Sequence, residues 1–469
     1  MAGDAYDAYD VIVIGAGPTG ENVADRAVRG GLTAAIVEAE LVGGECSYWA
    51  CMPSKALLRP ATSVAETRAL RGVAGARLNP AEVLARRDTF AHQWEDDGQV
   101  AWLKSAKIDL FRGRGRLAGE RLVAVGDTVL QARQAVVIAT GTTASVPAVL
   151  AGVNPWTSRE ATSAHAVPGR LAIVGGGVVG CEMATAWSAL CSEVTLVTPG
   201  RLLDRLPDFA GDLVAAGLRD AGVDVRLGVG VAEAKRAGTG GGGGSGNGPV
   251  TLVLADGTSV EADEVLAATG RSPHTGDIGL EMAGLSPGSW LDVDDTMRVP
   301  AVAGGWLYAA GDVNHLALLT HMGKYQARVC GDAIADRAAG REPTVRDRSS
   351  KTCVPQVIFT IPEVAAVGLT AEQAERAGHR VRTVEYDLGL VAGAKLFADG
   401  YTGRAQMVVD EDRRTILGLT LAGPGVGEII HAATIAVAGE VPLDRLWHAV
   451  PSYPTISEIW LRLLETYGL

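Results

Sequence analysis

The sequence predicts an α/β fold in which two Rossmann-like units are followed by a third, α+β domain. Residues 11–14 form a short apolar strand that runs into a glycine-rich turn and a helix, and the same pattern recurs from residue 171. From about residue 350 this pattern is absent, and strand-like and helical runs are mixed, as at residues 381–385 and 427–438. A chain of 469 residues is also too long for one hydrophobic core.

Composition and charge exclude several classes of protein. With 47% hydrophobic residues and 60 glycines, the chain is typical of a globular α/β protein with many tight turns. A formal net charge of −12, without a stripe of Lys and Arg, argues against a nucleic-acid partner and against an anionic membrane. The acidic first residues are unlike a secretory signal, and no apolar run approaches the roughly 18 residues that span a bilayer. We therefore expect a cytoplasmic protein.

The first glycine-rich turn, Gly15-Ala-Gly17-Pro-Thr-Gly20, is followed by a helix and by a strand at residues 33–37 that ends on Glu38. This is the context that a βαβ dinucleotide fingerprint requires. One glycine allows the tight turn, one lets the backbone approach a pyrophosphate, and one lets the helix pack closely on the strand. The N–H groups at the start of the helix would face the phosphates.

A second fingerprint, Gly175-Gly-Gly177-Val-Val-Gly180, follows the strand at residues 171–174 and leads through a helix to a strand at residues 194–197. A single motif of this kind is weak evidence, because glycine-rich turns are common. Its recurrence in the same context predicts two dinucleotide-binding units. Two cofactors are therefore expected.

The two units differ at the end of their second strand. Glu38 stands 18 residues after the last glycine of the first fingerprint, and Thr198 stands at the same distance after the second. An acid at this point binds a ribose 2′-hydroxyl and would repel a 2′-phosphate, so its absence from the second unit favours NADPH over NADH. Arg201 and Arg205 follow Thr198 and suit a phosphate, although each also fits an ordinary surface arginine.

Residues 237–248 consist mostly of glycine and lie between strand-like residues 223–227 and 250–254. We interpret them as a flexible hairpin tip inside the second unit and assign them no function.

Cys46 and Cys51 share one glycine-bounded segment, residues 43–55, that leads into an apolar helical run. A thiol at a helix N-terminus lies in a positive field, which lowers its pKa and favours the reactive thiolate. As a bare pattern, the pair equally fits two unrelated buried thiols. Six cysteines are too few for a disulfide scaffold, and we expect the others to be core or surface thiols: Cys181, Cys191, Cys330 and Cys353.

With these motifs the chain resembles the flavoprotein disulfide reductases, the family of dihydrolipoamide dehydrogenase, glutathione reductase and mercuric reductase. The resemblance covers nearly the whole chain. Besides the fingerprints and the cysteine segment, it rests on further motifs in the family's order: Ala139-Thr-Gly141, Cys181-Glu182, Ala268-Thr-Gly270-Arg-Ser-Pro273, Tyr308-Ala-Ala-Gly311-Asp312 and Phe359-Thr-Ile-Pro-Glu363-Val-Ala-Ala-Val-Gly368.

The resemblance implies FAD in the first unit and NAD(P)H in the second. Asp312 would reach a ribityl hydroxyl, although it also fits a helix N-cap. His321 belongs to a helix start that the family points at the flavin, although its own side chain also fits simple packing. The residues implied for FAD are Gly15, Gly17, Gly20, Glu38, Gly44, Thr140, Gly141, Asp312 and His321, and those for the nicotinamide cofactor are Gly175, Gly177, Gly180, Thr198, Arg201 and Gly270.

The resemblance also assigns catalytic roles. Cys51 is implied to be the sulfur beside the flavin, and Cys46 the outer sulfur that meets the acceptor. Lys55 and Glu182 match a pair beside the flavin, where a cation favours hydride acceptance and a carboxylate neutralises the buried charge. Lys55 also fits a surface lysine, and Glu182 an exposed glutamate in a first helical turn. Trp49, between the cysteines, is expected to pack rather than to narrow the site.

The chain departs from the family pattern in the run Pro451-Ser-Tyr453-Pro454-Thr455-Ile-Ser457-Glu458. The family has a histidine here, supplied by the second subunit, and this chain has Tyr453. A phenol with a pKa near about 10 is a poor proton acceptor at neutral pH. Glu458 therefore has no histidine to orient, and Tyr453 either donates a proton or only shapes the pocket. His448 is a weaker candidate to replace the histidine.

We therefore expect an FAD-binding domain in two parts, residues 1–160 and 288–347, an NAD(P)H-binding domain at residues 161–287 and a dimerisation domain at residues 348–469. The expected assembly is a homodimer with an active site shared between the subunits, and no metal site is expected. Electrons would pass from NAD(P)H through flavin to the cysteine pair, and on to a small disulfide or other thiol-reactive acceptor.

Other functions stay open at this point. Reduction of a quinone directly from flavin, as in a diaphorase, is favoured by the missing histidine. A mercuric-reductase-like activity is favoured by Tyr453, but the sequence ends without the C-terminal cysteine pair of that enzyme. A binding role with a structural flavin is the least supported, because both cysteines, Lys55 and Glu182 are present.

Overall fold

The computed structural model describes residues 7–238 and 248–469, which form two compact units. The first unit contains residues 7–52, 88–143 and 271–351, and the second contains the remaining described residues. Each unit carries one of the glycine-rich fingerprints. No helix among the described residues is both long and apolar enough to cross a membrane.

A mostly parallel sheet forms the centre of the first unit, with strand order β3-β2-β1-β6-β5-β4 and with β16 paired to β6. The apolar run at residues 11–14 is buried in β1, where β-branched residues suit a strand covered on both faces. The β4 and β5 strands add an antiparallel edge. The strands are β1 (Asp7–Ile14), β2 (Ala34–Glu38), β3 (Ile108–Arg112), β4 (Gly115–Gly119), β5 (Leu122–Val125), β6 (Thr128–Ile138) and β16 (Leu307–Ala309).

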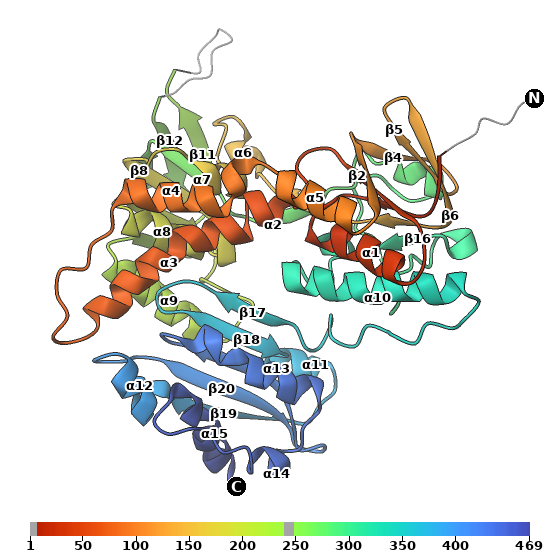
Figure 1. The fold of residues 1–469 in the computed structure, drawn as a ribbon. Coiled ribbons are helices and arrows are strands. Elements are labelled where there is room, and N and C mark those ends of the chain that lie inside the picture. Colours follow the sequence, from red (N-terminus) through yellow and green to blue (C-terminus); the bar gives the residue numbers. More distant parts are fainter. Residues whose placement is uncertain (1–6, 239–247) are drawn as a thin grey trace, which may run out of the picture. The chain divides into compact units, whose positions relative to one another are not determined.

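Helices α1 (Pro18–Arg29) and α10 (Thr320–Ala338) lie side by side against this sheet (Figure 1). Glycines of α10 allow the close approach, because a Cβ at Gly323 would lie 2.3 Å from Thr19 Oγ1. Arg26 of α1 holds Asp332 of α10 through two hydrogen bonds of 2.8 and 2.6 Å. The start of α10 is thus fixed beside the first glycine-rich turn. The unit also contains α2 (Gly44–Tyr48), α5 (Asp97–Ser105) and the short turns η1 (His92–Trp94), η2 (Leu280–Ala283), η3 (Ala303–Gly305) and η4 (Asp312–Asn314).

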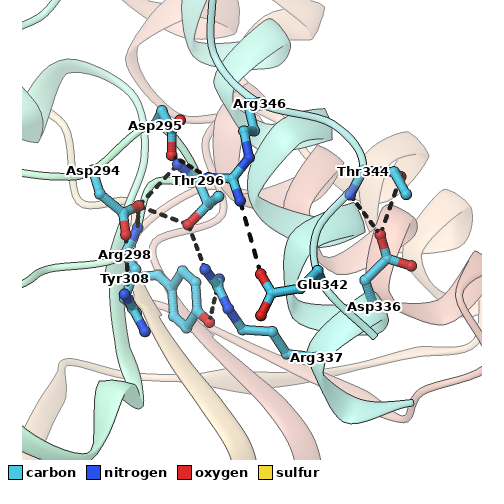
Figure 2. Close-up of polar contacts among 10 residues, drawn as sticks. All are labelled: Asp294, Asp295, Thr296, Arg298, Tyr308, Asp336, Arg337, Glu342, Thr344 and Arg346. Atoms are coloured by element: carbon cyan, nitrogen blue, oxygen red, sulfur yellow. Dashed lines mark hydrogen bonds and ion pairs between the residues drawn. The ribbon is translucent and has the colours of Figure 1, made fainter. Parts of the chain in front are cut away.

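Figure 2 shows how polar contacts hold the other end of α10. Arg337 donates to the Tyr308 hydroxyl at 3.0 Å and to Thr296 Oγ1 at 2.9 Å, which joins α10 to β16 and to the loop before it. Asp336 accepts from the Thr344 backbone N–H at 3.1 Å, and Arg346 pairs with Asp295 at 2.8 Å. The chain that leaves α10 is therefore tied back to the same unit.

The second unit contains a parallel sheet with strand order β10-β9-β8-β14. The second fingerprint joins β8 to α8, and the fully buried Trp187 of α8 lies in a core shared with α3, α9 and the sheet. These elements are β8 (Arg170–Val174), β9 (Glu193–Thr198), β10 (Asp224–Leu227), β14 (Glu264–Ala267), α3 (Cys51–Arg68), α4 (Pro80–Phe90), α6 (Ala148–Ala151), α7 (Ser158–Ser163), α8 (Val178–Ala189) and α9 (Asp208–Asp220). Two short strands that belong almost entirely to the first unit, β7 (Thr142–Ala144) and β15 (Arg271–Pro273), pair with each other.

The expected hairpin around the glycine-rich segment has a different first strand. The predicted strand at residues 223–227 is β10, which pairs in parallel with β9. The strand that pairs with β12 (Val250–Leu254) is β11 (Val231–Arg236), and β13 (Ser259–Ala262) completes an antiparallel sheet. Most of the predicted hairpin tip, residues 239–247, lies outside the described residues.

Residues 355–467 form an antiparallel sheet with strand order β17-β18-β21-β20-β19, on which α13 packs against β18 and β21 (Figure 1). Strands and helices are mixed as expected, which confirms the predicted fold class. The strands are β17 (Pro355–Ile358), β18 (Val364–Gly368), β19 (Val381–Asp387), β20 (Arg404–Asp410) and β21 (Thr415–Ala422). The helices and turns are α11 (Ala371–Arg376), η5 (Leu388–Leu390), α12 (Ala392–Phe397), η6 (Val426–Glu428), α13 (Ile430–Ala438), α14 (Leu443–Leu446), η7 (Ile456–Glu458) and α15 (Ile459–Tyr467).

Candidate active site

The first fingerprint forms a tight turn between β1 and α1. A Cβ at Gly15 would lie 2.5 Å from the Ala139 carbonyl oxygen, and a Cβ at Gly20 would lie 1.9 Å from the Gly15 oxygen. Neither position has room for a side chain. Gly17, the N-cap of α1, has no other heavy atom within 4 Å of the position of a Cβ, so a phosphate can approach its backbone.

The second fingerprint repeats this geometry between β8 and α8. A Cβ at Gly175 would lie 2.3 Å from the Ala268 oxygen, and a Cβ at Gly180 would lie 2.0 Å from the Gly175 oxygen. Gly177 is the N-cap of α8 and is open in the same way as its counterpart. The two turns are therefore equivalent in shape, and both suit a pyrophosphate.

The two units differ in the last residue of the strand that follows each fingerprint helix, which is β2 in the first unit and β9 in the second. Glu38 ends β2, and its Oε2 accepts from the Ala16 backbone N–H at 2.7 Å, which places the carboxylate at the glycine-rich turn. Thr198 ends β9 and is buried. Arg201 is exposed and pairs with Asp208, which offsets part of its charge, and Arg205 is exposed nearby.

The residues implied for the rest of FAD line the same unit as the first fingerprint. Thr140 Oγ1 is buried and has no hydrogen-bond partner among the described residues, and the space around Gly141 is open. Asp312 accepts a hydrogen bond of 3.1 Å from the Thr142 hydroxyl, and burial raises the pKa of its carboxyl. The N-cap of this turn is Gly311, so Asp312 is not capping it. A buried unpaired hydroxyl beside an open glycine turn fits a polar cofactor such as FAD.

The remaining residues implied for cofactors are placed as follows. Gly44 begins α2, and a Cβ there would lie 2.8 Å from the Gly17 Cα. His321 is exposed in the first turn of α10, which begins at Thr320 as expected from the sequence. Gly270 follows β14 and accepts a hydrogen bond from the Ser145 backbone at 2.9 Å.

Cys46 lies in α2, and Cys51 is the first residue of α3. In the structure no disulfide joins the two, and their thiols hydrogen-bond to each other; this contact together with burial raises the pKa of the Cys46 thiol. The turn between the two helices thus lets the sulfurs meet. The ring of Trp49, between them, lies 5.6 Å from the Tyr48 ring, which is a packing contact.

Sequence reasoning missed two residues near the cysteines, Thr320 and Lys324, and the buried carboxylate of Glu21. Thr320 Oγ1 lies 3.3 Å from Cys51 Sγ, and the same hydroxyl lowers the pKa of Cys46. The positive charge of Lys324, one turn further along α10, also lowers the pKa of Cys46. The charge of Lys324 also lowers the pKa of the Glu21 carboxyl in α1. The position of Thr320 beside the predicted helix start was the only signal for this group in the sequence.

Lys55 and Glu182 form an ion pair in the second unit. Lys55 Nζ lies 2.8 Å from Glu182 Oε2, and the Phe359 backbone N–H donates to the other carboxylate oxygen at 3.0 Å. The Glu182 side chain is 5% exposed, so it is not an exposed first-turn glutamate. Lys55 also lies over the Phe359 ring, 5.0 Å from its centroid.

The Tyr453 side chain is 76% exposed in the single chain. Glu458 is buried and pairs with Arg462, while its Oε2 has no hydrogen-bond partner among the described residues. His448 is exposed. One oxygen of the Glu458 carboxylate, for which the resemblance implied no role without a histidine, thus pairs with an arginine.

Comparison with known proteins identifies related sequences over nearly the whole chain. The family model for pyridine nucleotide-disulphide oxidoreductases matches residues 9–330, and the model for their dimerisation domain matches residues 354–463. Dihydrolipoyl dehydrogenase of Thermus scotoductus is 33% identical over 96% of this chain and 95% of its own length. Dihydrolipoyl dehydrogenase of Chlamydia muridarum is 31% identical over 97% and 96%, respectively.

Among solved structures, the HOCl-induced flavoprotein disulfide reductase RclA from Escherichia coli, as a Cu(II) complex, superposes with a TM-score of 0.82. The match covers 98% of this chain and 99% of that chain at 23% sequence identity. At this level of identity the likeness concerns the fold.

Proposed function

We propose, from the premise that the chain belongs to the pyridine nucleotide-disulphide oxidoreductase family, that it uses NAD(P)H to reduce a small disulfide or thiol-reactive acceptor through Cys46 and Cys51. The chain is an FAD-containing oxidoreductase of that family. The proposal concerns its acceptor class and the residues that carry the electrons.

The observation that carries the proposal is the contact between the two thiols at the start of α3. Cys46 and Cys51 hydrogen-bond to each other, and Thr320 lies 3.3 Å from the Cys51 sulfur. Sulfurs this close can form and break a disulfide without a large movement of the chain. The positive end of α3 favours a thiolate at Cys51, its first residue.

The residues of the chain have separate tasks in this proposal. The two fingerprints, Glu38, Thr140 and Asp312 bind the cofactors, and bound FAD supplies two-electron transfer between NAD(P)H and the disulfide. Lys55 keeps a positive charge one helical turn after Cys51, held by Glu182. Cys46 is the sulfur that attacks the acceptor, and Cys51 then displaces the product thiolate from Cys46.

An anaerobic titration of the purified, FAD-loaded protein with NADPH tests this proposal. One equivalent should produce the long-wavelength absorbance of a thiolate next to oxidised flavin, and two more thiols per chain should then react with a thiol reagent than before reduction, when the exposed Cys191 already reacts. Lipoamide, glutathione disulfide and cystine are suitable first acceptors. Bleaching of the flavin without new thiols would overturn the proposal.

We also propose that NADPH is preferred over NADH. The support is Thr198, which stands where an acid would repel a 2′-phosphate, with Arg201 and Arg205 nearby. The pairing of Arg201 with Asp208 weakens the positive field, so the preference should be modest. Equal values of kcat/KM for NADH and NADPH would contradict it, and Thr198→Glu should shift the ratio towards NADH.

The assembly proposed is a homodimer in which Tyr453 reaches the active site of the other subunit. The support is the dimerisation-domain match and a set of apolar side chains that are exposed in the single chain. Val450 and Tyr453 are 85% and 76% exposed, which is unusual for such residues in a monomer. The others in this domain are Leu390, Leu396, Phe397, Ile435 and Trp447.

Tyr453 favours a second candidate, the reduction of a quinone directly from flavin, because this position lacks a histidine. The same tyrosine is the only feature that favours a mercuric-reductase-like acceptor. A Cys46→Ser variant separates disulfide reduction from quinone reduction. Disulfide reduction requires Cys46 and should stop, whereas quinone reduction should continue at an unchanged rate.

A further inference from the structure

Two hydrogen bonds join the Arg271 guanidinium to one threonine. Arg271 begins β15, and its Nε donates to Thr142 Oγ1 at 2.5 Å, while its Nη2 donates to the Thr142 carbonyl oxygen at 2.7 Å. Thr142 begins β7, the strand that pairs with β15, and its side chain is buried. Both residues belong to the first unit, and the proposed function gives a task to neither of them.

These bonds fix the direction in which the Thr142 hydroxyl donates. A guanidinium has no acceptor, so Thr142 Oγ1 accepts from Arg271 and keeps its own single proton for another group. That group is Asp312, whose Oδ2 lies 3.1 Å from Thr142 Oγ1. Arg271 therefore holds the hydroxyl in the orientation that donates to the Asp312 carboxylate.

The backbone that carries Asp312 is held separately, by α10. The Gly311 N–H donates to Gln326 Oε1 at 2.8 Å, and Asn314 Nδ2 donates to the same oxygen at 2.8 Å. Gln326 is fully buried. Because α10 anchors both ends of the η4 turn, the loss of Arg271 should free the Asp312 side chain without moving the turn.

The charges near Asp312 act in the same direction as this geometry. Burial is the largest effect and raises the pKa of the Asp312 carboxyl, whereas the charge of Arg271 and the hydrogen bond from Thr142 lower it. The negative charge of Glu45 in α2 also raises this pKa. Without Arg271, burial and Glu45 would both act against the ionised carboxylate.

We propose that Arg271 is a positioning residue for FAD, which acts through Thr142 to keep Asp312 ionised and to fix its carboxylate for a ribityl hydroxyl. The bond to Thr142 uses Oδ2, so Oδ1 can accept from the cofactor. An ionised acceptor binds a hydroxyl more strongly than a neutral one. The inference rests on the FAD-binding role that the proposed function gives to Asp312.

The test is the rate of FAD release from the loaded protein, followed by the rise in flavin fluorescence after dilution into buffers between about pH 5 and 9. Release from the wild type should accelerate as the pH falls and Asp312 takes up a proton. Arg271→Gln should release FAD about tenfold faster at about pH 7, and its acceleration should begin about one pH unit higher. Asp312→Asn should release FAD quickly at every pH, which separates titration of Asp312 from acid unfolding.

Thr142→Val tests whether the effect of Arg271 passes through the hydroxyl. Valine has nearly the same shape but cannot accept from Arg271 or donate to Asp312, so release should again accelerate and the profile should move to higher pH. The double variant Arg271→Gln/Thr142→Val should release FAD less than about threefold faster than Arg271→Gln alone, because both changes break the same series of hydrogen bonds. Effects that multiply in the double variant would overturn the inference. Since its shape is preserved, Thr142→Val also tests the series where Arg271→Gln does not fold.

Arg346→Gln is the matched control, because Arg346 lies in the same unit and pairs with Asp295 at 2.8 Å, beyond the far end of α10 (Figure 2). It should release FAD as the wild type does. A wild-type profile in Arg271→Gln or Asp312→Asn, or an equal acceleration in Arg346→Gln, would contradict the proposed role of Arg271. These measurements use no NADPH, acceptor or cysteine, so failure of the proposed function would appear separately as a lack of new thiols in the NADPH titration.

Discussion

The Lys55 ammonium and the Glu182 carboxylate lie 2.8 Å apart, on helices that are separated by more than a hundred residues in sequence. The carboxylate is almost entirely buried, and its second oxygen accepts from the Phe359 backbone. Removal of the lysine leaves this charge without a cation. Because a buried unpaired carboxylate is costly, the pair is sensitive to the loss of either partner.

Lys55→Met should therefore destabilise the protein by about 2–3 kcal/mol, less than for a fully buried pair because the Lys55 side chain is 35% exposed. Glu182→Gln keeps the hydrogen bond to Phe359 and should cost less. Urea unfolding measures both, with the exposed Lys104→Met as control. If Lys55 also supplies charge beside the flavin, stopped-flow reduction by NADPH should slow in Lys55→Met at unchanged flavin content. An unaltered rate would contradict that role.

Thr320→Val removes the hydroxyl that contacts Cys51 at 3.3 Å and that lowers the pKa of Cys46. Valine has nearly the same shape, so folding should be preserved. A hydrogen bond to a charged sulfur contributes about 1.5 kcal/mol, which corresponds to about one pH unit. The pH at which the long-wavelength absorbance of the reduced protein appears should rise by about that amount. Thr62→Val in α3, whose hydroxyl donates to the Leu58 carbonyl, should not move it.

The glycine fingerprints were predictable because each depends on neighbours a few residues away. Gly15 and Gly20 meet across one turn, and Gly175 and Gly180 repeat the same approach. The proximity of Cys46 and Cys51 was predictable for the same reason, because a short turn separates α2 from α3. Short-range steric constraints of this kind leave a clear pattern in a sequence.

The group formed by Glu21, Thr320 and Lys324 was not predictable. Thr320 is 269 positions from Cys51, and its approach depends on how α10 packs on α1. The prediction of the first hairpin strand was wrong for a related reason. Residues 224–227 and 231–236 both form short strands, and the hydrophobic pattern alone did not decide which of them pairs with β12. The domain boundaries inferred from the sequence stay a prediction.

Val450→Asp should weaken the homodimer. Val450 is 85% exposed in the single chain and lies in the dimerisation domain, so a carboxylate there would lose water on association. A cost of about 3 kcal/mol raises the dissociation constant about a hundredfold. Analytical ultracentrifugation should detect monomers at concentrations where the wild type is dimeric. Met282→Asp, an exposed apolar position in the other unit, is the control and should stay dimeric.

Tyr453→Phe should lower kcat with a disulfide acceptor less than about threefold, because a phenol is a poor proton acceptor at neutral pH and its ring is kept. Tyr453→His alone should not raise kcat strongly, since the pairing of Glu458 with Arg462 offsets the negative charge that would orient an imidazole. Steady-state kinetics between about pH 6 and 9 would measure both. A tenfold loss in Tyr453→Phe would instead identify the hydroxyl as a proton donor.

Glu21 should also make the stability of the protein depend on pH. Its folded-state pKa is raised from 4.5 to about 7, so its favourable contribution is complete below pH 4.5 and is lost as the pH rises to about 7. A shift of this size corresponds to roughly 3 kcal/mol. Relative to the wild type, Glu21→Gln should therefore gain up to that amount between about pH 4.5 and 8, as measured by urea unfolding of the FAD-loaded proteins. A constant difference between the two proteins across this range would show that the carboxyl does not titrate with a raised pKa.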